Sequence, residues 1–142
     1  MERIMIATDG SRSAKRALDA AANLTKTLNG ELTVVTVAGS ISVADLKRLA
    51  RGTDEVDDAL AALANKILDG ACKRAKSIGV RRIKRQSETG DAATAILDAA
   101  RRKRADFLVV GRHGFGPLTG WLLGSVSHKI MSLAPCKVIV VP

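Results

Sequence analysis

Tyrosine is absent from this sequence, and two phenylalanines and one tryptophan are its only aromatic side chains. The core must therefore be aliphatic, and the chain lacks the stacking rings that RNA-binding sheets usually present. Cysteine is scarce too: Cys72 and Cys136 lie far apart, without the CxxC spacing or histidine-rich company of a zinc or redox site. We expect two buried thiols.

Long apolar segments are missing as well. No uninterrupted run approaches the roughly 18 residues of a membrane span, and the N-terminus has no charged-then-apolar signal. The sequence therefore predicts a cytoplasmic, reduced protein with no membrane association.

Its 142 residues, 46% hydrophobic and 26% charged, are typical of one globular domain, and no linker or low-complexity segment divides residues 1–142.

The charge is one-sided: 23 lysines and arginines against 14 acidic residues give a formal net charge of +9. Such a field attracts anionic partners in general, including nucleotides, nucleic acids and anionic membranes. Its local sources include the run RRIKR at 81–85 and the run RRKR at 101–104. Both runs are also explained as solvated charge on an edge strand or at a helix end, and the shortage of aromatics favours that interpretation.

Strand patterns alternate with helical ones along the whole chain. Apolar and β-branched runs predict strands at Arg3–Thr8, Glu31–Ala38, Phe107–Val110 and Lys137–Val141, and a polar strand is expected at Arg82–Glu88. Apolar residues at helical spacing predict helices from Ser11 to Asn29, from about Asp54 to Gly79, from Asp91 into the run at 101–104, and from Ser125 to Leu133. The segment 41–53 has only weak helical patterning and receives no assignment.

This alternation predicts an α/β fold, an open five-stranded parallel sheet with helices on both faces, because parallel strands need long crossover connections. The polar third strand suits a sheet edge. Ligands bind such sheets outside the strand carboxyl ends, where Asp9 and Gly111 are expected. In the long helix we expect an apolar stripe that faces the core, formed by Val56, Leu60, Leu63, Ile67 and Ala71.

Glycines are concentrated in one stretch, from Gly111 to Ser125, directly after the fourth strand. Its spacing misses the GxGxxG dinucleotide fingerprint by one residue, and the GxxxxGK[ST] phosphate loop is absent. What remains is the pattern G-x2-G-x9-G-S. Two glycines let a loop bend around an anion, and a helix N-terminus at Ser125 adds N–H donors, with Arg112 and His113 nearby. A glycine-rich surface loop with Ser125 as the helix cap is the alternative.

That pattern, together with a first strand ending ATDGS and a chain ending VIVVP, resembles the universal stress protein family in its ATP-binding branch. The likeness covers essentially the whole chain. It implies a Rossmann-like sheet of the adenine nucleotide alpha hydrolase type, with ATP across the strand carboxyl ends and a role in stress response. It also implies a homodimer through the last strand, Val138 to Val141, which agrees with the need to cover an apolar edge strand.

By the same resemblance, the nucleotide site would draw on three segments. Asp9 would lie near the ribose or triphosphate, and Ala7 and Val37 would line the adenine region. Ala7 stands where nucleotide-binding members often have proline. The other residues of the implied site are Thr8, Val110, Gly111, Arg112, His113, Gly114, Gly124, Ser125 and Val126.

Two of these side chains, and also Trp121 in the glycine-rich stretch, have alternative explanations. Asp9 could cap the first helix; facing phosphates it would need cations, so Mg²⁺ held by Asp9 is implied together with ATP. His113 is explained equally well as a solvent-facing loop residue. Trp121, which adjoins two leucines, suits packing or a partner contact better than stacking on a base.

Three functions are compatible with the sequence. The favoured one is a regulatory ATP-binding protein and not an enzyme, since no general base beyond His113 or Asp9 and no P-loop lysine is evident, and any hydrolysis should be slow. The second is a basic nucleic-acid-binding module that uses GRHG as a backbone clamp, but such a clamp joins two helices and this one follows a strand. The third is an ATPase or ATP-dependent transferase, for which the SGGxDS loop and a second substrate pocket are lacking.

Overall fold

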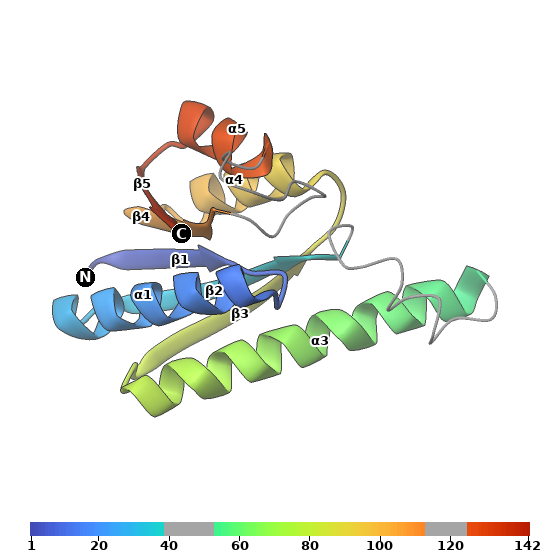
Figure 1. Ribbon diagram of the computed structural model, residues 1–142, viewed down its shortest axis with the longest axis horizontal. Helices are drawn as coiled ribbons and strands as arrows, with labels where there is room; N and C mark the ends of the chain where they lie inside the picture. The colour runs from blue at the N-terminus through green and yellow to red at the C-terminus, as the bar shows by residue number, and fades with distance from the viewer. Residues whose placement is uncertain (39–52, 113–124) are drawn as a thin grey trace.

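The computed structural model describes residues 1–38, 53–112 and 125–142, and Figure 1 shows strands and helices alternating along them. The elements are β1 (Arg3–Ala7), α1 (Arg12–Leu28), β2 (Glu31–Val37), α3 (Thr53–Ile78), β3 (Arg82–Glu88), α4 (Ala92–Arg102), β4 (Phe107–Gly111), α5 (Ser125–Leu133) and β5 (Lys137–Val141). All the predicted strands and helices are present, with ends that differ by about a residue.

The five strands form one sheet in the order β3-β2-β1-β4-β5, and all neighbouring strands in it are parallel. The predicted α/β fold with an open five-stranded sheet is therefore confirmed. The polar strand β3 is at one edge, as expected from its sequence, and β5 is at the other. The strands between them are almost completely buried, which explains their continuous apolar sequences.

Helices cover both faces of this sheet (Figure 1). On one face α1 and α3 pack against a cluster of buried residues that includes Ile6, Val34 and Leu68. On the other face α4 and α5 cover a second cluster, which includes Val35 and Ile96. Aliphatic side chains make up the fully buried core apart from Met5, so the expectation of an aliphatic core holds.

The buried face of α3 differs from the predicted stripe. Leu60, Leu63 and Ile67 flank this face and are half-buried, because the helix is rotated by about one residue from the predicted orientation. Ala71 is buried as predicted. The side chain of Val56 lies outside the described residues. The buried positions of α3 are Ala59, Ala64, Leu68, Ala71 and Ala75. Four of these five are alanines, whose small side chains let α3 lie close to α1 and the sheet.

The two cysteines are another difference. Cys72 and Cys136 are free thiols, and both are half-buried rather than buried. Partial burial still disfavours the thiolate and raises the pKa of each thiol. Neither thiol is therefore activated as a nucleophile. Among the described helices, none combines the length and apolarity that a bilayer span requires.

Candidate functional site

The strand order reverses at β1. The chain passes from β1 to β2 on one side, whereas β4 adds to β1 on the other. In sheets of this type the crevice at the carboxyl ends of the two strands that flank the reversal is the usual ligand site. Register places Ala7 beside Val110 and beside Val35. Asp9 and Arg112, each two residues further along, therefore follow the ends of adjacent strands at the same edge, here called the carboxyl edge.

The turn between β1 and α1 is held by a short series of hydrogen bonds. The Thr8 amide donates to Val35 O at 2.9 Å, and the Gly10 amide donates to Thr8 Oγ1 at 3.1 Å. Gly10 has a φ of +81°, a conformation that favours glycine. The Ser11 amide then donates to Asp9 Oδ1 at 2.9 Å. The position of Asp9 is thus fixed by backbone contacts on both sides of it.

Ser11, rather than Asp9, caps helix α1. Its hydroxyl accepts the Ala14 amide at 3.2 Å, so the suggestion that Asp9 caps the helix is wrong. Asp9 is half-buried, and this burial raises its pKa, although the hydrogen bonds from Ser11 act in the opposite direction. A carboxylate kept in a place that disfavours its charge is characteristic of functional sites, and a bound cation would relieve the cost.

A buried serine fixes α5 at the same edge. Ser127 Oγ donates to the backbone oxygen of Gly111 at 2.8 Å, and the Arg112 amide donates to Val141 O at 2.7 Å. The first residue of α5, Ser125, is therefore held near the end of β4. The sequence interpretation missed Ser127. The available signal was its helical spacing from Ile130, which places both residues on the core-facing side of α5.

Ser127→Ala is expected to lower the free energy of unfolding by about 1 kcal/mol, because one buried hydrogen bond is lost. Ser132→Ala is the matched control: Ser132 Oγ bonds to His128 O at 3.0 Å in the same helix, but it is exposed. Urea denaturation of both variants measures the difference. Equal effects of the two substitutions would show that the bond to Gly111 does not anchor α5.

The other predicted site residues divide into three groups. The side chains of Ala7, Val37 and Val110 are fully buried in the core cluster on the α4 and α5 face, and Thr8 is almost fully buried. Ser125 is exposed and Val126 is half-buried against the α4–α5 core. Three residues of the predicted set lie outside the described residues, namely His113, Gly114 and Gly124.

The residues at this edge fit a metal ion only if the ligand supplies most of the donors. In the described part of the chain no group of three or more His, Cys, Asp or Glu side chains comes together. Asp9 is a single carboxylate, and one or two carboxylates combined with phosphate oxygens are the usual environment of Mg²⁺. The donor set therefore suits Mg²⁺ that arrives with a phosphorylated ligand.

Comparisons with known proteins agree with this architecture. The chain matches the family model described as "Universal stress protein family" over residues 1–142. It is 33% identical over 149 aligned residues to universal stress protein YxiE of Bacillus subtilis, covering 98% of this chain and 97% of that protein.

Two solved structures show the same fold. The crystal structure of a universal stress protein in complex with cAMP has a TM-score of 0.77 and 29% identity, covering 99% of this chain and 97% of the other. Universal stress protein UspA from Lactobacillus plantarum has a TM-score of 0.79 and 22% identity, with the same coverage. The family match over all 142 residues and the common fold lead to one conclusion: this chain belongs to the universal stress protein family.

Proposed function

We propose that this protein is a regulatory protein that binds ATP together with Mg²⁺ at the carboxyl edge, between β1 and β4. The observation that carries the proposal is the pair Asp9 and Arg112, oppositely charged residues that follow adjacent strands where the strand order reverses. The N-terminus of α5 is held at the same edge by the bond between Ser127 and Gly111. The proposal thus places anion-binding and cation-binding groups at one site.

Each group has a distinct part in this proposal. Arg112 and the N-terminus of α5 bind phosphate oxygens, and the glycines of the G-x2-G-x9-G-S pattern allow the backbone to approach them. Asp9 contacts the ribose or holds Mg²⁺. The metal neutralises phosphate charge when it is bound. Ala7 and Val37 provide a buried apolar floor for the adenine.

The nucleotide class is supported by a relative. The cAMP-bound universal stress protein is 29% identical to this chain and matches 99% of its length. Its ligand combines an adenine ring with a phosphate, and the carboxyl edge here offers an apolar floor beside cation and anion sites. Hydrolysis is proposed to be slow at most, because Asp9 is assigned to Mg²⁺ or ribose and the sequence has no P-loop lysine.

We also propose that the protein is cytoplasmic and forms a homodimer through β5. This strand is at the sheet edge, has the apolar sequence KVIVV and is largely half-buried in the single chain. A second copy related by a two-fold axis would pair with its open side. Light scattering at micromolar concentration should give the mass of a dimer, and the mass of a single 15.0 kDa chain would contradict this proposal.

The first test of the function is mass spectrometry of nucleotide released when the purified protein is denatured. It should be accompanied by calorimetric titration of the stripped protein with ATP and Mg²⁺. We expect ATP or ADP in near-stoichiometric amount, or saturable binding heat. Absence of both would place this chain among family members that do not bind ATP.

Gly114→Ala and Gly124→Ala are each expected to weaken ATP binding about tenfold or more without unfolding the domain, because an added methyl group would intrude where the pattern needs close backbone approach to phosphate. Calorimetry measures the affinity, and circular dichroism checks that the fold is retained. Gly70→Ala is the control, since a Cβ at Gly70 would meet no atom within 4 Å. Unchanged affinity in both site variants would contradict the proposed phosphate contacts.

A further inference from the structure

The two basic runs of the sequence border the same face of the sheet. Arg102, from the second run, bonds through Nη2 to Glu88 Oε1 at 2.5 Å, and Glu88 is on β3, the strand that carries the first run. On the same strand, Lys84 pairs with Glu31 of β2 at 3.3 Å. The end of α4 and the edge strand β3 therefore border a common surface.

Strand alternation shows which side chains share this surface. Val35 and Val37 of β2 pack on the α4 side of the sheet. Glu31 is four residues before Val35 on the same strand, and because side chains alternate between the two faces, it also faces the α4 side. Register then places Arg82 beside Glu31 and Arg3 on the other side of it. We use the name basic face for the set Arg3, Arg82, Lys84, Arg102, Lys103 and Arg104, all of which are exposed.

Most of the acidic groups on this side are already engaged. Glu31 pairs with Lys84, Glu88 pairs with Arg102, and Asp106 accepts the backbone N–H of Arg3. Within residues 1–38, 53–112 and 125–142, no carboxylate pairs with the side chain of Arg82, Lys103 or Arg104. These three charges are therefore available to an external anion.

The end of α4 places a charged residue in a conformation that costs free energy. Helices α1, α3 and α4 all end in the same motif, in which one residue at the helix end has a positive φ. This residue is Asn29 in α1 and Gly79 in α3, and both residue types tolerate the conformation. In α4 it is Arg104, with a φ of 51°. Neither the helix dipole nor the turn requires arginine there, and glycine would be more stable.

We propose that the basic face binds the phosphate backbone of nucleic acid without sequence preference. Guanidinium groups suit phosphate oxygens, and Arg82 and Arg104 both lack a carboxylate partner among the described residues. The basic face contains no aromatic residue to stack on bases. Contacts are therefore to phosphates, and binding weakens steeply with salt.

A membrane surface fits this face less well. Amphipathic membrane contacts combine basic residues with apolar side chains that insert between lipids. The exposed large apolar residues of the described chain are Met1, Leu28, Met131 and Leu133. None of them is in β3 or at the end of α4.

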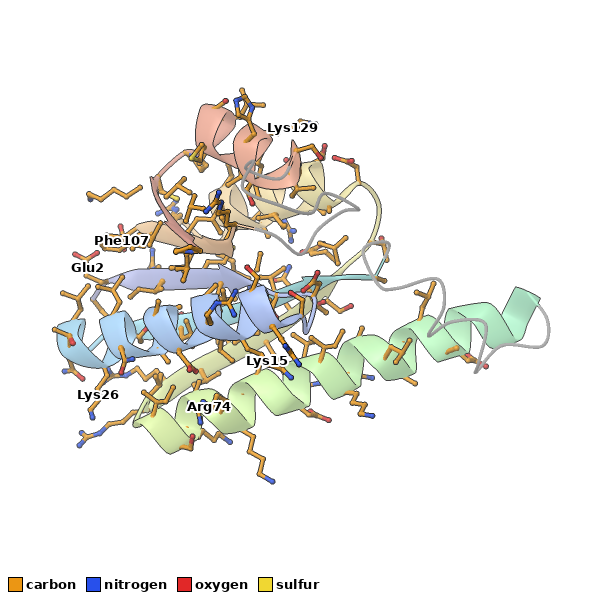
Figure 2. The ribbon with its side chains drawn as sticks, viewed as in Figure 1. Glu2, Lys15, Lys26, Arg74, Phe107 and Lys129 are labelled. Carbon is orange, nitrogen blue, oxygen red and sulfur yellow. The ribbon has the colours of Figure 1, made fainter. Side chains whose placement is uncertain are left out.

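Part of the basic face lies away from the proposed nucleotide site. Arg3 and Arg82 are the first residues of β1 and β3, at the amino ends of the strands, where Figure 2 labels Glu2 and Phe107. Arg102 instead reaches Glu88, the last residue of β3, at the end of the sheet that Asp9 and Arg112 follow.

The test uses fluorescence anisotropy with a labelled 20-nucleotide oligouridylate and the corresponding oligothymidylate, from 50 to 200 mM salt. The variant Arg82→Gln, Lys103→Gln and Arg104→Gly should bind about tenfold more weakly, with a salt slope reduced by about 2. The control variant Lys66→Gln, Lys73→Gln and Lys76→Gln removes the same charge from exposed positions of α3, on the other side of the sheet. It should change the affinity less than threefold, as expected for a diffuse charge effect.

Arg104→Gly alone separates function from folding. It should raise the midpoint of thermal unfolding by roughly 2 to 4 °C and still weaken binding of both oligonucleotides. Asn29→Gly makes a similar change at the end of α1 without removing a charge, and it should leave their binding unchanged.

Three results would overturn the proposal. The first is an equal loss of binding in the two triple variants, which would mean that net charge alone, and not the basic face, determines the affinity. The second is displacement of the oligonucleotides by ATP, which would place them at the carboxyl edge. The third is that vesicles of equal parts phosphatidylglycerol and phosphatidylcholine bind through these residues whereas the oligonucleotides do not.

Discussion

Asp9→Asn is expected to stabilise the fold at neutral pH while weakening the binding of Mg²⁺-ATP about ten- to hundredfold. Asparagine keeps a side-chain oxygen that can accept the Ser11 amide, so the turn before α1 is preserved. The substitution removes the charge that burial disfavours in the free protein. It removes the same charge that the proposed site needs for Mg²⁺ or ribose, and charged hydrogen bonds contribute about 1.5 to 3 kcal/mol.

The stability effect should depend on pH in a defined direction. Burial raises the pKa of Asp9 in the folded state above its ordinary value of 3.8. The stabilisation from this group is therefore fully present below pH 3.8 and is lost as the pH rises through the folded pKa. Asp9→Asn should accordingly show its gain in unfolding free energy at pH 7 and little gain at pH 3.

Urea denaturation at the two pH values and calorimetry with Mg²⁺-ATP measure both effects of Asp9→Asn. Asp98→Asn is the control, because Asp98 is an exposed residue of α4 that pairs with Arg101. It should neither stabilise the protein nor change nucleotide affinity. If Asp9→Asn leaves nucleotide affinity unchanged, Asp9 only stabilises the turn before α1, and its proposed role in the nucleotide site is contradicted.

Gly30→Ala is expected to lower the free energy of unfolding by about 2 to 3 kcal/mol, the largest stability effect that we predict. A Cβ at this position would lie 2.5 Å from the backbone oxygen of Glu2 and 3.0 Å from Ile4 Cδ1. That oxygen cannot easily move, because it accepts the Glu31 amide at 2.9 Å between β1 and β2. The strain must therefore separate two central strands at their amino ends.

Gly70→Ala should have the opposite sign. Gly70 is an exposed residue inside α3, and an added Cβ would meet no atom within 4 Å. Alanine there should raise the free energy of unfolding by roughly 0.5 to 1 kcal/mol, because glycine loses more conformational freedom in a helix. Guanidinium denaturation of both variants compares them directly. A destabilising effect of Gly70→Ala, or a neutral Gly30→Ala, would contradict these contacts.

The site and the basic face differ in how much of each was visible in the sequence. The ATDGS turn and the glycine pattern pointed to the carboxyl edge, because residues that follow parallel strands must meet there. Ser127 was missed, since a serine within a helix carries no sign of the backbone oxygen that it will meet. The basic runs were visible, but their position beside one face of the sheet, on β3 and at the end of α4, was not.

The sequence by itself determined the order of elements in this protein. Apolar periodicity placed the described strands and helices, and the polar pattern of Arg82–Glu88 marked an edge strand, because local patterns record which side of an element will be buried. Only the tertiary structure decided the rotation of α3, the partial exposure of the cysteines and the capping of α1 by Ser11 in place of Asp9. The first two features depend on how closely neighbouring elements pack, and the third depends on which side chain lies within hydrogen-bonding distance of a free N–H group. The local periodicity of the sequence contains no information on either.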